Sequence, residues 1–312
     1  MKYANPITDK ISITYDGNIY SYEHYLAPTN MVGITDENYP NYDASTIYNT
    51  GDFVIIPEIK RIFKCTSDGV QGIFPPSDPI KWIDWGFVNS YKMLATDEQI
   101  GEKTEGTDIQ LKMPTSQVDV LALLDCQFIS LQFEQIDNDT NEVVKKENII
   151  GKDIGCTSFA EYFYTPAKQK SRVLIDLEWL PNSATNLIFN GEVKIGTLVE
   201  GYSNSLGVTL YGTSLNIEDR SKIQIDEFTG FRRVLRYGHV RILDAKLVID
   251  ASDWNDTVIK LSSIVSKNIL FIPTQKDCFS EMTNLAYIER VDMPVDNPTK
   301  EDINITLVGV AG

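Results

Sequence analysis

Residues 48–85, YNTGDFVIIPEIKRIFKCTSDGVQGIFPPSDPIKWIDW, contain the pattern that decides the fold class of this chain. A Gly-Asp turn precedes the short apolar run FVII, and a second run, RIFKC, ends at Cys65. Both runs have the length and the residue types of strands, and turn residues bound them. A Gly- and Pro-rich loop then leads to Trp82 and Trp85, two of only four tryptophans in the chain. The stretch therefore predicts a very small β-module with aromatic side chains at its edge.

Two hairpins are predicted on either side of this module. In KISITYDGNIYSYEHYL, residues 10–26, two alternating runs flank Asp16-Gly17-Asn18, and Gly17 supplies the positive φ that a tight turn requires. In FISLQFEQIDNDTNEVVKKENII, residues 128–150, the alternation continues on both sides of Asp137-Asn138-Asp139. Residues 27–43, rich in Pro, Asn and Asp, are typical of a loop or linker.

Period-two alternation continues through the second half of the chain. The segment SRVLIDLEWLP, residues 171–181, predicts a strand with one apolar face, formed by Val173, Ile175, Leu177 and Trp179. Few segments have a helical period. They are the short SFAEYFY at 158–164 and DWNDTVIKLSSIVSK at 253–267, where the predicted apolar side consists of Trp254, Val258, Leu261 and Val265.

These patterns predict a mainly β protein, with a small N-terminal β-module followed by one or two β-sandwich-like domains. The predicted divisions are a hairpin and linker at 1–41, the module at 42–89, a sandwich-like domain at 90–200, and a second β-rich domain or completion of the sandwich at 201–312.

The net charge of the chain limits the classes of partner that we expect it to bind. The 312 residues carry 44 acidic and 28 basic side chains, a formal net charge of −16. A nucleic-acid binder needs a basic stripe, and docking on an anionic membrane needs a basic surface, so neither partner is expected. No apolar signal segment and no membrane-spanning run is visible, which predicts a protein without membrane insertion. The four scattered cysteines fit neither a zinc site nor a disulfide framework, and reduced thiols are expected.

The module resembles the short chitin-binding modules found on bacterial chitinases and cellulases. Tyr42 stands near the first aromatic of that pattern, and a Tyr-x-x-Gly-Asp-x-Val motif begins at Tyr48. Pro75 and Trp82 close the match. The sequence departs from the pattern in lacking the leading tryptophan, and Phe63 replaces a tyrosine of the second strand.

A wider resemblance covers residues 42–290. The junction WIDWGFVNSYKMLATDEQIGEKTEGTDIQLKM and the segments IGTLVEGYSNSLGVTLYGTS and DEFTGFRRVLR resemble a family of tailed-bacteriophage virion proteins. That resemblance implies a tail or baseplate component, assembled in the host cytoplasm into the virion tail in several copies. The implied partners are other tail or baseplate proteins, further copies of the chain, and a host surface polysaccharide. A dedicated carbohydrate-binding adhesin is the alternative.

Sugar recognition requires exposed aromatic faces and polar groups that orient hydroxyls. The candidate glycan-binding residues are Tyr48, Asp52, Phe63, Trp82 and Trp85. Alternatively, the aromatic side chains form the core of a module too small to have another. Because Trp82 and Trp85 are three residues apart, they cannot share one face of a strand.

The segment FRRVLRYGHVR is the second candidate site. It gathers Arg232, Arg233, Arg236 and Arg241 in an otherwise acidic chain, and arginine is favoured at protein interfaces. The alternative is a strand whose charged face is solvated.

Catalytic and metal-binding motifs are sparse. The chain has two histidines, His24 and His239, and no nucleophile-elbow, zinc-protease or phosphate-loop motif. Asp137, Asp139 and Asn141 begin like a calcium loop, but the required glycine and the final glutamate are missing. We therefore expect no enzyme activity, no cofactor, no metal site, and a plain hairpin tip at 137–141.

Overall fold

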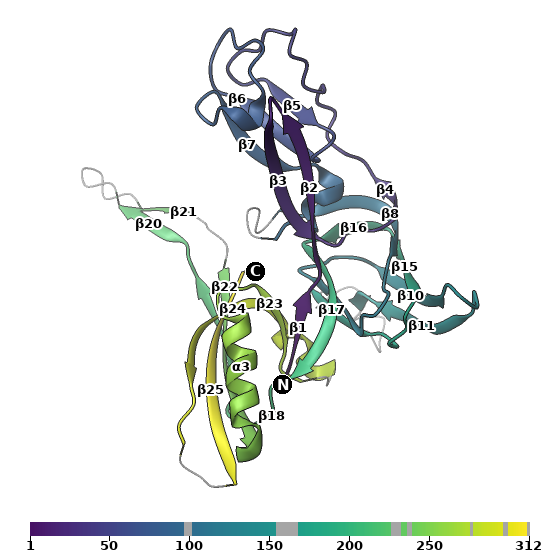
Figure 1. Cartoon of the computed structure of the whole chain (residues 1–312), viewed down its shortest axis with the longest axis vertical. Coiled ribbons are helices and arrows are strands. Elements are labelled where there is room, and N and C mark those ends of the chain that lie inside the picture. The colour runs from purple at the N-terminus through teal and green to yellow at the C-terminus, as the bar shows by residue number, and fades with distance from the viewer. Residues whose placement is uncertain are drawn as a thin grey trace, which may run out of the picture.

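The computed structural model describes residues 1–96, 102–153, 168–225, 232–235, 239–274, 277–295 and 299–310. Strands dominate, and every ladder between named strands is antiparallel (Figure 1). The mainly β prediction is confirmed. Four buried clusters organise the described residues: one inside a sandwich, one under a helix, and two in the N-terminal module.

A ten-stranded sheet links the two larger clusters. Its strand order is β14-β9-β17-β1-β23-β24-β25-β22-β18, and β19 pairs with β22 beside β18. The strands are β1 (Lys2–Pro6), β9 (Val120–Leu124), β14 (Arg172–Asp176), β17 (Thr197–Ser205), β18 (Val208–Thr209), β19 (Ser214–Asp219), β22 (His239–Asp250), β23 (Ile269–Ile272), β24 (Asn284–Asp292) and β25 (Lys300–Gly309).

A six-stranded sheet packs against the β9 end of this sheet and completes a sandwich. Its order is β11-β10-β15-β8-β16, and β4 also pairs with β8. The strands are β4 (Asn30–Ile34), β8 (Thr104–Met113), β10 (Ser130–Asp137), β11 (Val143–Ile150), β15 (Ser183–Asn190) and β16 (Glu192–Ile195). Leu121 and Leu123 from one sheet and Phe133 and Phe189 from the other belong to the same buried cluster, as expected for two facing sheets.

The C-terminal half of the ten-stranded sheet is covered by α3 (Trp254–Ile264), which follows the short turn η2 (Ala251–Asp253). Leu261 and Ile264 are buried on Leu243, Leu307 and their neighbours. The predicted helical side was partly wrong, because the helix ends at Ile264 and Val265 is exposed.

The N-terminal module contains a three-stranded sheet, β5 (Phe53–Ile56), β6 (Arg61–Cys65) and β7 (Trp82–Phe87). The turn η1 (Pro75–Ser77) precedes β7, and α1 (Asn89–Lys92) follows it. The predicted hairpin forms β2 (Thr8–Tyr15) and β3 (Asn18–Tyr25), and Asp16 and Gly17 both have positive φ, +48° and +78°. Positive φ at both central residues gives the turn the twist that suits a hairpin.

Several smaller elements complete the description. They are β12 (Lys152–Asp153) with β13 (Lys168–Gln169), β20 (Lys222–Ile225) with β21 (Arg232–Leu235), and η3 (Asp277–Met282). The segment 158–164, predicted as a short helix, lies outside the described residues.

Some of the other predicted elements are confirmed, and others differ in the structure. The second hairpin is confirmed, since β10 pairs with β11 around residues 138–142. The loop predicted at 27–43 was wrong in part, because β4 lies within it and pairs with β8. The domain boundary predicted at residue 200 falls inside β17, which pairs with both β9 and β1. On β14, Val173 and Ile175 are buried, whereas Trp179 lies beyond the strand and is 63% exposed.

One carboxyl group lies inside the fold without a partner. Glu200 of β17 is 1% exposed, and neither of its carboxyl oxygens has a hydrogen-bond partner among the described residues. Burial raises the pKa of Glu200 to about 8, because the charged form loses its hydration. The carboxyl group is therefore protonated at neutral pH.

We predict that Glu200 makes the protein less stable as pH rises. Between the ordinary value of 4.5 and about 8, the folded state holds a proton that the unfolded chain releases. Raising pH through this window therefore favours unfolding, by about 1.4 kcal/mol per pH unit. Urea titrations from pH 5 to 8 should show this slope reduced in Glu200→Gln. An identical slope in the two proteins would contradict the assignment.

Candidate functional site

Three of the predicted glycan-binding aromatics lie in the core of the module. Tyr48, Phe63 and Trp82 are 5%, 2% and 1% exposed and share one buried cluster with Phe74. The ring of Trp82 meets the ring of Tyr48 edge to face, with centroids 5.2 Å apart. A sugar cannot stack on a face that protein atoms already cover, so the prediction of a stacking platform at these three positions is corrected.

The hairpin β2–β3 is what closes this core. Tyr15 stacks on Phe74 with ring centroids 4.2 Å apart and an interplanar angle of 12°. Tyr20 also meets Phe74, and the Arg61 guanidinium lies 4.4 Å from the ring centroid of Tyr22. A segment predicted to lie apart from the module thus supplies one wall of its aromatic cluster.

Asp52 is exposed, but it has a structural contact. Its carboxylate accepts a hydrogen bond of 2.7 Å from the backbone N–H of Asn49, which closes the turn before β5. The backbone of Asp52 also pairs with that of Cys65. This carboxylate orients the turn, and no exposed aromatic of the predicted set other than Trp85 remains to accompany it.

Trp85 differs from Trp82, as the odd spacing predicts. Between β6 and β7 the register shifts, so that Phe63 pairs with Asp84 and Ile62 with Gly86. Trp85 is the extra residue of this bulge, and Gly86 follows it with φ +120°. Bulges redirect side chains, and Trp85 is 49% exposed.

Around Trp85 lies an aromatic surface formed by Tyr39, Phe53, Lys64 and Trp85. Tyr39 stacks on Phe53 at 4.9 Å, and Phe53 meets Trp85 at 5.4 Å with an interplanar angle of 81°. The Lys64 ammonium lies 5.4 Å from the centroid of Phe53 and 5.0 Å from that of Trp85. Lys64 is held there because it pairs with Phe53 on one side and Ile83 on the other. The surface combines π faces, one cation and partial exposure, which suits contact with a polar partner.

Sequence reasoning missed Tyr39 and Phe53. Tyr39 lies in the segment predicted as a linker, and Phe53 begins a run that reads as uniformly buried. Alternation was the available signal: Val54 and Ile56 belong to the module core, so Phe53 must point to the other face.

The basic cluster does not form one patch. Arg232 is exposed on β21, Arg233 belongs to the same strand, and Arg236 lies outside the described residues. Arg241 is on β22, where its side chain is 14% exposed and its guanidinium contacts the Glu281 carboxylate at 3.1 Å. The prediction of Arg241 as an open interface residue is therefore corrected.

Arg241 belongs to an internal ion cluster. The Arg172 side chain is 2% exposed and lies 3.8 Å from the Glu281 carboxylate. It donates a hydrogen bond of 3.1 Å to the side-chain oxygen of Asn284. Burial and the neighbouring charge of Arg241 lower the pKa of Arg172 to about 10. Burial alone would raise the pKa of Glu281, but the Ser171 hydroxyl and the two guanidinium groups outweigh it and lower that pKa. The cluster ties β14 and β22 to η3, which is a structural role.

The residues that begin like a calcium loop form a hairpin tip. Asp139 donates its backbone N–H to the Asp137 carboxylate at 2.8 Å, and Asn182 donates 2.6 Å to Asp139. Throughout the described residues, no group of three or more His, Cys, Asp or Glu side chains is placed to hold a metal ion. In the same part of the chain, no helix has the length and apolar character needed to span a membrane.

Comparison with known proteins identifies no relative. No family model matches the chain, and no curated protein and no solved structure matches it.

We predict opposite consequences for the two tryptophans of β7. Trp82→Ala removes a fully buried ring and should cost about 3–5 kcal/mol of unfolding free energy. Trp85→Ala removes a half-exposed ring and should cost much less. Urea unfolding of the full chain followed by far-UV circular dichroism measures both. Equal losses would contradict the assignment of one ring to the core and the other to the surface.

Proposed function

We propose that this chain is a structural component of a tailed-phage virion, assembled in several copies in the tail tip, the baseplate or a collar-like ring. The resemblance of residues 42–290 to virion proteins supports the class of protein. The observation that supports assembly into several copies is a projecting arm, formed by β20 and β21.

The arm lies apart from the cores. Strands β20 and β21 pair with each other and with no other described strand. Figure 1 shows them extending away from β22 and the rest of the molecule. An isolated two-stranded ladder is marginal in water, and both of its outer edges offer unpaired backbone groups. Such an arm gains stability when a neighbouring molecule covers it.

The charge of the arm favours another copy of the same chain as the neighbour. The eight residues of β20 and β21 include Lys222, Arg232 and Arg233 and no acidic residue, and the sequence that connects the two strands adds Asp226 and Glu227. The whole chain has a net charge of −16, so the surface outside the arm is strongly acidic. A basic arm reaching the acidic surface of the next copy gives a contact that closes into a ring when the rotation between copies permits.

We predict that the arm holds copies together. By size-exclusion chromatography with light scattering, the wild type should form oligomers at low salt that shrink as salt rises, because salt screens the attraction. Lys222→Glu combined with Arg232→Glu should shift the protein to monomer. The matched control is Lys112→Glu with Lys300→Glu, two exposed lysines outside the arm, and it should retain the oligomer. A wild type that is monomeric at every concentration, or an arm variant that assembles normally, would refute the proposal.

A carbohydrate-binding adhesin is the second candidate, and the aromatic surface favours it. Trp85 and Tyr39 remain 49% and 38% exposed beside the Lys64 ammonium. Stacking on such rings is individually weak, but several copies in one assembly would multiply its effect.

We predict that, if this second function holds, Trp85→Ala weakens binding of the full chain to purified host surface polysaccharide at least tenfold. Trp179→Ala removes a tryptophan that is more exposed and lies away from this surface, and it should bind like the wild type. Surface plasmon resonance compares the three proteins. Binding by none of the three removes the adhesin from consideration, and equal binding by all three excludes the aromatic surface as its site. Neither outcome affects the assembly test.

A further inference from the structure

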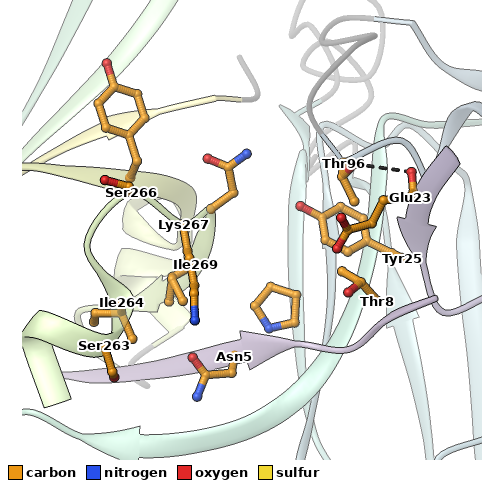
Figure 2. Close-up of a pocket in the computed structure, with 13 residues that line it drawn as sticks. Asn5, Thr8, Glu23, Tyr25, Thr96, Ser263, Ile264, Ser266, Lys267 and Ile269 are labelled. Atoms are coloured by element: carbon orange, nitrogen blue, oxygen red, sulfur yellow. Dashed lines mark hydrogen bonds between the residues drawn. The ribbon is translucent and has the colours of Figure 1, made fainter. Parts of the chain in front are cut away.

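A polar cleft separates the base of the β2–β3 hairpin from the turn that follows α3. Its volume is about 880 Å³, in the range of clefts that hold small ligands. Figure 2 shows its floor crossed by β1, which contributes Asn5, with Thr8, Glu23 and Thr96 on one wall and Ser266 and Lys267 on the other. It lies apart from both the aromatic surface and the arm.

The two walls carry opposite charges that form no ion pair with a described residue. No oppositely charged side chain forms an ion pair with Glu23 or Lys267 in the described part of the chain, although Lys10 lies across the hairpin ladder from Glu23. The hydroxyl of Thr96 donates a hydrogen bond of 3.3 Å to the backbone carbonyl of Glu23 (Figure 2). This bond does not use the carboxylate of Glu23, which can therefore accept hydrogen bonds from a ligand. Among the described lining residues, Glu23 and Lys267 are the charged ones and lie on opposite walls, so this lining is balanced in charge and favours a ligand without net charge.

The remaining lining is rich in hydroxyl and amide groups. Thr8, Asn5, Ser263 and Ser266 contribute short polar side chains, and Tyr287, 38% exposed, adds a ring at the edge. Hydroxyls that both donate and accept, together with an aromatic face, match the hydroxyls and C–H faces of a sugar. An apolar ligand would leave these groups without partners.

The turn that carries Lys267 is held in an unfavourable conformation. Lys267 donates its backbone N–H to the carbonyl of Ile264 at 3.2 Å, and Ser266 between them has φ +67°. A type II turn requires positive φ at this position and normally uses glycine or asparagine. The turn holds Lys267 at the rim of the cleft even though a positive φ is unfavourable for a serine such as Ser266.

We propose that this cleft binds a short, uncharged oligosaccharide, with Glu23 and Lys267 accepting and donating hydrogen bonds to its hydroxyls from opposite walls. This site goes beyond the proposed assembly function and is separate from the aromatic surface.

The test is isothermal titration of the full chain with neutral trisaccharides of glucose, galactose, mannose and N-acetylglucosamine, each up to 10 mM. At least one should bind, and Glu23→Gln and Lys267→Ala should each weaken it at least tenfold. Both side chains are exposed, so both variants should keep the wild-type unfolding midpoint. Lys112→Ala, outside the cleft, is the matched control and should bind normally.

Three outcomes would overturn the proposal. The first is the absence of binding by every trisaccharide. The second is binding that Trp85→Ala abolishes and the two cleft variants leave unchanged, which would place the sugar on the aromatic surface. The third is binding of neutral tripeptides without binding of sugars, which would assign the cleft to a peptide. None of these outcomes depends on the oligomeric state, so failure here and failure of the assembly proposal are distinguishable.

Discussion

The structure depends on one short strand, β1, which is hydrogen-bonded on both sides. It pairs with β17 through Lys2–Pro6 and with β23 through Lys2–Ala4, so the first residues of the chain occupy the middle of the ten-stranded sheet. Successive side chains of a strand point to opposite faces. Tyr3 accordingly joins the cluster beneath α3, and Ala4 joins the sandwich cluster. The last part of the chain, β22 to β25, is thereby joined to a sandwich built mainly from its middle.

The path of the chain after β1 explains the closed module. Ile7 still bonds to Glu200 of β17, and β2 begins at the next residue. The hairpin therefore leaves the sheet at a fixed point and covers the aromatic cluster with Tyr15 and Tyr20. On the other face of β5–β7, Ile55 and Ile62 are buried, whereas Tyr39 and Trp85 remain partly exposed near the bulge. The exposed aromatic residues therefore differ from most of the positions that a chitin-binding resemblance would suggest.

Local pattern predicted the strands well, because alternation and turn residues act over a few residues. It anticipated the Asp16-Gly17 turn, the hairpin tip after Asp137 and the opposite fates of Trp82 and Trp85. It failed where the outcome depends on distant partners. Nothing near Tyr48 shows that the earlier hairpin, through Tyr15 and Tyr20, covers its core. Nothing near Arg241 shows that Glu281 neutralises it. The cleft was equally invisible, since Glu23 and Lys267 are brought together only by the sheet.

Hydrogen exchange of Tyr3→Ala, followed by mass spectrometry, tests most directly whether β1 couples the two halves. Tyr3 belongs to the cluster beneath α3, so a local effect would be confined to β23, β24 and α3. If β1 couples the two halves, amides of β17 and β9 in the sandwich should also exchange faster. The reason is that loss of pairing at β1 exposes β17, which pairs with β9. Faster exchange in both halves is the predicted result. Unchanged protection of β9 and β17 would contradict the account and leave two independently stable halves.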